Sequence, residues 1–230
     1  VEAYEDNAIK IISEENRKAD AIKNGVILQP SGTAFNVNSL LKELKNSSRF
    51  KENIRNYAIG IGGKNMKIIH ETYYHKLDKK RRITEEDIDL MAYQCGLENQ
   101  SESYEVYDVI PVKYEVDGYE TENPEGRIGQ HIKGKYHLII GSGDLKSYLQ
   151  KMLERVGSHQ ATPIQIAPEA FAIAVSDEED RKEGCAIIDM GASSTTLMIY
   201  KNEILQYLLV VPLGAANITK DIQSLGISEA

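Results

Sequence analysis

The sequence contains few cysteines and lacks the spacings at which cysteine and histidine hold a metal ion. Its 2 cysteines, Cys95 and Cys185, lie far apart and have apolar neighbours. Disulfide-rich secreted domains need several paired cysteines, and zinc sites need ligands at short, regular intervals. We therefore expect two reduced, structural cysteines in a cytoplasmic protein. The 5 histidines are expected at the surface: His70, His75, His131, His137 and His159.

Long apolar runs and an excess of positive charge are also missing. No apolar stretch approaches the roughly 20 residues of a membrane-spanning helix, and no signal peptide is recognisable. The formal net charge of −8 argues against a nucleic-acid partner, which would need a basic stripe. One basic run, residues 76–82, is interpreted as a solvated loop or a patch that faces a partner. The nucleophile motifs of hydrolases are absent.

Proline and glycine are scarce, with 6 and 17 residues in a chain of 230. Disordered and low-complexity chains contain far more of them, and the charged fraction of 27% is that of an ordinary globular protein. This length allows one large or two modest domains with a hydrophobic core. The first residue is Val1 rather than methionine, which suggests a piece of a longer protein.

Hydrophobic periodicity predicts a chain of mixed strands and helices. Strands are expected at 8–13, 25–28, 54–61, 66–74, 104–116, 127–129, 135–140, 185–189, 195–200 and 204–211. Helices are expected at 38–44, after the N-cap Thr84, at 144–156 and at 216–225. The glycine cluster at 60–63 is not a P-loop, because no Gly-Lys-Ser/Thr follows it. The acidic residues 177–180 are interpreted as a solvated connector, with a metal site as the alternative.

The most informative segment is 185–200, a strand that ends near Asp189, a turn of small residues, and a returning strand. Because the turn has no bulky side chain, its backbone amides can converge on one acceptor and form an anion cradle. Asp189 could hold a metal ion through water. An ordinary hairpin, with Asp189 as a turn cap, is the alternative interpretation.

The candidate phosphate-binding residues are Asp189, Gly191, Ala192, Ser193, Ser194 and Thr195. Gly214 and Ala215 are further candidates for a place near the ribose or the phosphates. Strand propensity alone would also explain Thr195, and a plain strand-to-helix turn would explain Gly214. No catalytic residue is nominated.

The motif Asp-x-Gly-small-small-Ser/Thr-Thr resembles the second phosphate-binding motif of the actin, chaperone and sugar-kinase superfamily. Three further stretches narrow this resemblance to the cell-division protein family FtsA. They are Ile110–Gly118 with the following Asn123–Gly129, the glycine-rich strand exit at 60–63, and Val211–Ile222 after the hairpin. Together they cover most of the chain in the order that the family has.

The resemblance implies an α/β, actin-like (ribonuclease H-like) ATPase fold with an inserted small α+β subdomain, called 1C. Residues 1–64 would form the first part of subdomain 1A. Residues 65–143 would be the insert, and residues 144–184 the return to 1A. Residues 185–230 would begin subdomain 2A with the phosphate hairpin.

The resemblance also implies a cytoplasmic adaptor of the bacterial division ring, peripheral at the inner face of the membrane at the division site. Such a protein binds FtsZ, meets other divisome proteins, takes part in septum formation and self-associates through its insert. The FtsZ-binding region and a C-terminal membrane helix would lie outside this chain. ATP and Mg are expected cofactors of the longer protein.

Two departures limit what the resemblance implies about ATP. The chain lacks the first phosphate hairpin and the adenosine segment that close an actin-like site, so weak or absent ATP binding is expected for it. Ala192 and Ser193 replace glycines, which accept positive φ more easily. Ala167 stands where relatives with brisk hydrolysis have Glu or Gln, so about 10²–10⁴-fold of general-base assistance would be missing. We expect at most a slow ATPase, with nucleotide as a structural or slow switch.

Two alternatives remain open. A small-molecule kinase of the same superfamily would need a catalytic aspartate near Ala167, and the sequence offers none clearly. The pilus-assembly relative of FtsA has a similar fold, but the run from Asn123 to Gly126 favours FtsA.

Overall fold

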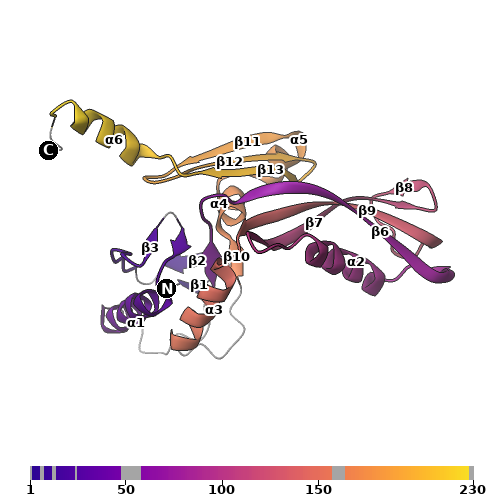
Figure 1. Cartoon of the computed structure of the whole chain (residues 1–230), viewed down its shortest axis with the longest axis horizontal. Coiled ribbons are helices and arrows are strands. Elements are labelled where there is room, and N and C mark those ends of the chain that lie inside the picture. The colour runs from indigo at the N-terminus through magenta and orange to yellow at the C-terminus, as the bar shows by residue number, and fades with distance from the viewer. Residues whose placement is uncertain are drawn as a thin grey trace. The chain divides into compact units, whose positions relative to one another are not determined.

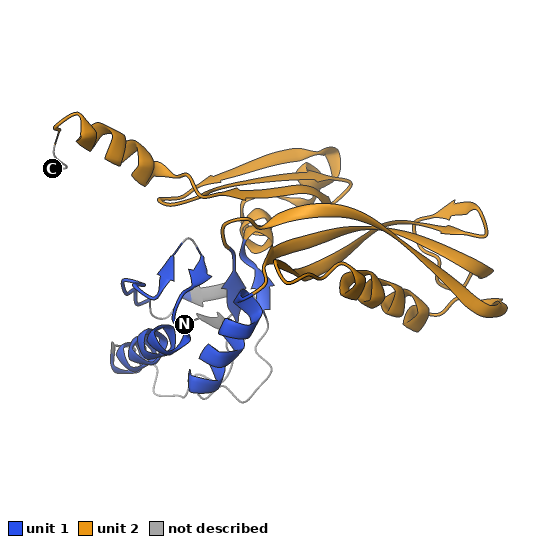
Figure 2. Cartoon of the chain, viewed as in Figure 1, with its two compact units in different colours: residues 1–62, 144–167 blue, residues 63–143, 168–230 orange. Residues whose placement is uncertain are grey.

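The computed structural model describes residues 2–5, 8–11, 14–23, 25–47, 58–156 and 164–227. The chain forms two compact units (Figure 2). Unit 1 combines residues 1–62 and 144–167, and unit 2 combines residues 63–143 and 168–230. The predicted insert and the predicted phosphate hairpin therefore belong to the same unit. The finer division into four segments stays a prediction.

Unit 1 consists of small sheets and two packed helices. Its elements are β1 (Glu2–Glu5), β2 (Ala8–Ile11), β3 (Ile22–Lys23), β4 (Val26–Ile27), α1 (Pro30–Ser47), β5 (Ile59–Ile61), α3 (Leu145–Val156) and β10 (Ile164–Ile166). β5 and β10 pair in parallel, whereas β1–β2 and β3–β4 are antiparallel. The apolar stripe of α3 buries Leu145, Leu149 and Met152, and α3 packs on α1.

Unit 2 is built on one seven-stranded sheet. Its elements are β6 (Lys67–Arg82), α2 (Glu85–Glu98), β7 (Tyr104–Val116), β8 (Tyr119–Thr121), β9 (Ile128–Ser142), α4 (Ala167–Val175, whose first residue belongs to unit 1), α5 (Glu178–Glu183), β11 (Cys185–Met190), β12 (Thr195–Lys201), β13 (Ile204–Val211) and α6 (Ala215–Ser224). The strand order is β11-β12-β13-β6-β9-β7-β8. The pairing of Leu209 with Lys67 joins the two halves of the sheet.

In the half made of β6, β9, β7 and β8, α2 lies along one face of the sheet (Figure 1). Buried residues of α2 and of these strands form one hydrophobic core. Met91 and Cys95 of α2 are almost fully buried. They pack with Leu138 and Ile140 of β9 and with other strand residues in one cluster. Because α2 covers one face of the sheet, the alternate residues of the same strands face the other way.

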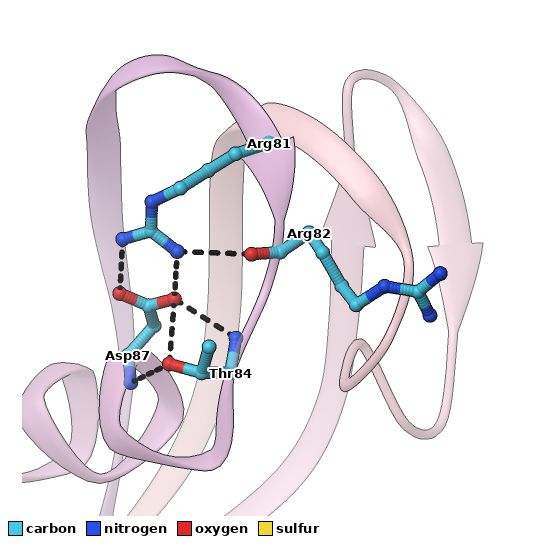
Figure 3. Close-up of polar contacts among 4 residues, drawn as sticks. All are labelled: Arg81, Arg82, Thr84 and Asp87. Atoms are coloured by element: carbon cyan, nitrogen blue, oxygen red, sulfur yellow. Dashed lines mark hydrogen bonds and ion pairs between the residues drawn. The ribbon is translucent and has the colours of Figure 1, made fainter.

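A network of polar contacts marks the start of α2 (Figure 3). Thr84 is the N-cap, and its hydroxyl accepts a hydrogen bond from the Asp87 amide at 3.3 Å. The Asp87 carboxylate accepts from the Thr84 amide at 2.9 Å and completes a capping box. Arg81 donates to both oxygens of Asp87, at 2.6 and 2.8 Å. These bonds hold the pKa of Asp87 well below its usual range, the Arg81 contact contributing most.

Two strands extend further than the sequence patterns predicted. The basic run 76–82 was interpreted as a solvated loop or a patch that faces a partner; it is not a loop but part of β6, with an irregularity between Lys76 and Arg81. Two short strands were expected around Gly134, but β9 is continuous, and a Cβ at Gly134 would lie 2.5 Å from the Tyr136 ring. Both extensions follow from pairing with a neighbouring strand, which no local pattern encodes.

Two other expectations are wrong. The acidic segment 177–180, expected as a connector, starts the short helix α5, because Asp177 and Asp180 form a capping box. His137, expected at the surface, is only 7% exposed. It lies on the sheet face opposite α2, where its Nδ1 is 2.9 Å from the Leu205 carbonyl oxygen. Burial lowers the pKa of His137, so the folded protein favours the neutral ring.

Candidate phosphate-binding turn

The predicted phosphate turn is a tight two-residue loop between β11 and β12. The strands pair in register up to Met190 and Thr195. The Gly191 amide then donates to the Ser194 carbonyl oxygen at 2.9 Å, which leaves Ala192 and Ser193 at the tip. The Gly191 amide is thus used inside the hairpin, and the amides at the tip are the ones left to face an anion.

Hydrogen bonds join the loop to the start of α6, the helix that follows β13 (Figure 1). The Ala215 amide donates to the Gly191 carbonyl oxygen at 3.0 Å, and the Ala216 amide donates to that of Ala192 at 2.9 Å. The structure therefore brings together the two groups of predicted site residues, 191–195 and 214–215. The same bonds occupy amides at the start of α6 that an anion would otherwise use.

Gly214 allows this close approach. A Cβ at this position would lie 2.4 Å from the Gly191 carbonyl oxygen and 2.6 Å from that of Ala192. These distances are far inside van der Waals contact, so only glycine fits without a backbone shift. Its amide is held by the Asn217 side-chain oxygen at 3.0 Å. The sequence suggested that Gly214 lies near a bound nucleotide. In the structure, Gly214 allows the start of α6 to pack closely against the loop.

Asp189 and Thr195 lie on opposite faces of the hairpin. Asp189 pairs directly with Thr196, and these two share a face, since paired residues project to the same side. Thr196 is 8% exposed. The Thr195 hydroxyl instead donates to the Leu213 carbonyl oxygen at 2.7 Å. Thr196 is therefore the threonine closer to Asp189, and Thr195 would have to change partner to donate to a phosphate.

The substitution of small residues for glycine does not strain the loop. Among the described residues, positive φ angles occur at four non-glycine positions, and neither Ala192 nor Ser193 is one of them. Gly191 also has no positive φ. The loop therefore does not need glycine at positions 192 and 193. Their replacement by Ala192 and Ser193 is no argument against an anion-binding loop here.

Ala167 and Glu169 occupy different environments at the start of α4. Within unit 1, Ala167 lies close to Gly60, and a Cβ added at Gly60 would lie 3.4 Å from the Ala167 Cβ. Within unit 2, burial raises the pKa of Glu169 to about 7, and Asp108 of β7 adds to the rise. Glu169 in turn raises the pKa of Tyr200 of β12, where burial is the larger cause. Glu169 is thus a partly buried carboxyl group, whereas the Ala167 position offers no side chain for chemistry.

The described residues give no independent sign of a metal centre. Within them, no group of three or more His, Cys, Asp or Glu side chains is placed to hold an ion. A magnesium ion held by Asp189 through water would not require such a group. In the same part of the chain, none of the helices combines the length and apolar character needed to cross a membrane.

The solved structure of the PilM–PilN type IV pilus biogenesis complex contains a chain with a similar fold. The TM-score is 0.57 at 14% identity, over 96% of this chain and 60% of that one. This likeness concerns the fold alone. It agrees with the expected actin-like α/β fold class. The expected small α+β insert corresponds to the segment 63–140, which matches a family model of its own.

Two family models match successive segments of the chain. Residues 63–140 match the SHS2 domain inserted in FtsA, and residues 186–230 match the cell division protein FtsA. FtsA of Streptococcus pneumoniae is 26% identical over 220 residues, and FtsA of Bacillus subtilis is 27% identical over 224 residues. The matches cover 94% and 96% of this chain but 47% and 50% of those relatives. The chain thus spans about half the length of the curated relatives it matches, and it belongs to the FtsA cell-division family.

Proposed function

We propose that this chain is the part of a division adaptor that carries the self-association surface, and that the longer protein links FtsZ to the membrane. The observation that carries the proposal is the match of residues 63–140 to the domain inserted in FtsA. That segment has its own core beneath α2. In this proposal the insert mediates contact between copies and with other divisome proteins at the inner face of the membrane.

Nucleotide has a structural or slowly switching role in the proposal. The loop at 191–194 would receive the phosphates, Asp189 would hold Mg through water, and Gly214 and Ala215 would lie near the ribose or the phosphates. Two observations support this arrangement: the loop lies beside the turn at Gly214 and Ala215, and the φ angles leave Ala192 and Ser193 unstrained. Because Ala167 cannot orient an attacking water, hydrolysis would be slow.

The adaptor role is tested by vesicle flotation with FtsZ. The protein extended to the full length of its gene should carry FtsZ to vesicles that contain anionic lipid. Residues 1–230 alone should not, because the FtsZ-binding and membrane-binding regions are proposed to lie outside them. Failure of the extended protein would contradict the adaptor role. Recruitment by residues 1–230 alone would show that these regions are wrongly assigned.

The nucleotide role is tested by calorimetric titration and single-turnover hydrolysis. Residues 1–230 should bind Mg-ATP with a Kd of about 1 mM or weaker, because the other segments that would contact the nucleotide are proposed to lie outside them. The extended protein should bind tightly and hydrolyse slowly, with a half-time of minutes or longer. In that protein, Ala167→Gln should speed hydrolysis by about 10²-fold or more. Micromolar binding by residues 1–230, or rapid turnover without the substitution, would overturn these expectations.

A further inference from the structure

The insert presents a broad polar surface on the side of its sheet that α2 leaves uncovered. Directly paired residues project to the same side of a sheet. The register places Thr72 beside Lys135 and Lys113, Tyr74 beside Lys133, and Lys76 beside His131. We call this surface the Tyr74 face, and its residues are Thr72, Tyr74, Lys76, Lys113, Glu115, Glu120, His131, Lys133 and Lys135.

The Tyr74 face is positively charged although the chain as a whole is acidic. Its four lysines outnumber its two glutamates. Lys133 pairs with Glu115 at 3.4 Å, and Lys113 pairs with Glu120 at 2.5 Å. Lys76 and Lys135 make no ion pair with any described residue. The net charge of the chain is −8, so this face is a local exception that would attract an acidic partner.

The same face is hollowed and carries an exposed aromatic ring. A cavity of about 250 Å³ is lined by residues that include Tyr74, Lys76, Glu115, His131 and Lys133. Tyr74 is 70% exposed, and the Lys133 ammonium lies 5.8 Å from the centre of its ring. Exposed tyrosines in recessed sites often contribute much of the energy of a protein–protein contact. Shape and charge together indicate a docking surface for an acidic segment.

The chain itself carries such a segment in α5. Asp177 and Asp180 cap this helix, so it is formed locally, and none of its residues is buried. Arg181 donates to the Ser176 carbonyl oxygen at 2.6 Å and thus turns toward its own chain. Glu179 and Glu183 are both exposed, and residues four apart lie on one side of a helix. They form an acidic edge, and among the described residues the one cation bonded to either of them is Lys201, which donates to the Glu183 backbone carbonyl oxygen and not to a carboxylate.

We propose that the Tyr74 face of one copy binds the acidic edge of α5 in a second copy. This rests on the proposed self-association and names the two surfaces that would mediate it. Every copy carries both surfaces in unit 2, with α5 packed beside β12 and the Tyr74 face on β6, β9 and β7. A contact between two different surfaces is heterologous, and it extends into a chain of copies unless its rotation closes a ring.

The test is a charge exchange followed by sedimentation velocity. The face variant is Lys76→Glu with Lys135→Glu, and the helix variant is Glu179→Lys with Glu183→Lys. Each alone should weaken self-association at least tenfold, because like charges would then meet. An equimolar mixture should recover association, since the reversed face of one variant meets the reversed helix of the other. The unmodified chain should also dissociate as salt is raised, because exposed charges are screened.

A matched control changes the same number of exposed lysines elsewhere, as Lys42→Glu with Lys220→Glu, and should leave association unchanged. Association of the unmodified chain that neither exchange weakens would overturn the pairing of these two surfaces but keep the proposed self-association. A mixture that does not recover association would also overturn the pairing. If the unmodified chain and the mixture both stay monomeric over the whole concentration range, both proposals are wrong.

Discussion

Replacing Asp87 by alanine is expected to lower the free energy of unfolding of unit 2 by about 2–3 kcal/mol. The carboxylate accepts from both Arg81 nitrogens and from the Thr84 amide and hydroxyl. Its side chain is 11% exposed, so solvent cannot replace these bonds fully. Urea denaturation followed by circular dichroism measures the change. Glu86→Ala, in the same first turn but exposed, should stay within about 0.5 kcal/mol.

The pH dependence gives a second measurement of the same group. Because Arg81 lowers the pKa of Asp87 in the folded protein, the ionised carboxylate stabilises the fold above the ordinary aspartate pKa near 4. That contribution falls as the pH drops below this value, because Asp87 then binds a proton more readily in the unfolded chain than in the folded protein. The difference in stability between the unmodified chain and Asp87→Asn should therefore shrink between pH 7 and pH 3. A difference that does not change with pH would show that Arg81 and Asp87 are not an ion pair in solution.

Replacing Gly214 by alanine is expected to separate α6 from the loop at 191–194. The new methyl group would meet two carbonyl oxygens, those of Gly191 and Ala192, at 2.4 and 2.6 Å. Both oxygens are held by the Ala215 and Ala216 amides, so relief of the clash breaks those bonds. We expect a loss of about 2–3 kcal/mol, in the range of other overpacked sites. Amide hydrogen exchange should accelerate at Ala215 and Ala216.

A glycine with more space serves as the control for this change. Gly143→Ala places its methyl group 3.4 Å from the nearest atom and at no positive φ, so exchange at Ala215 and Ala216 should not change. In the extended protein, Gly214→Ala should also weaken Mg-ATP binding at least tenfold, because it moves the proposed phosphate loop. Unchanged exchange and unchanged stability in Gly214→Ala would contradict the packing described for this junction.

Local chemistry determined much of unit 2 from the sequence alone. The bounds predicted for the strands at 104–116 and 204–211 agree with β7 and β13. Thr84 was recognised as an N-cap because a hydroxyl followed three residues later by a carboxylate is a local signal. The turn after β7 is also local, since Asp117 and Gly118 have the positive φ angles that an Asp-Gly pair adopts readily. The motifs that resemble FtsA are equally local, and the family matches confirm that assignment.

Contacts between distant residues decided what the sequence left open. Of the strand predicted at 54–61, the structure describes the last residues as β5 (Ile59–Ile61), and residues 54–57 lie outside the described residues. Pairing with β9 carries β6 through a basic run that resembled a loop, and packing beside β13 buries His137.

The candidate site follows the same division. The sequence alone identified the loop 191–194 and the turn at Gly214 as separate candidates, because each has a recognisable pattern of small residues. Only the tertiary structure joined them through the Ala215 and Ala216 amides, assigned the Thr195 hydroxyl to Leu213, and placed Thr196 beside Asp189. The physical reason is range: capping, turn and strand preferences act over a few residues, whereas register and close backbone approach depend on segments far apart in the chain.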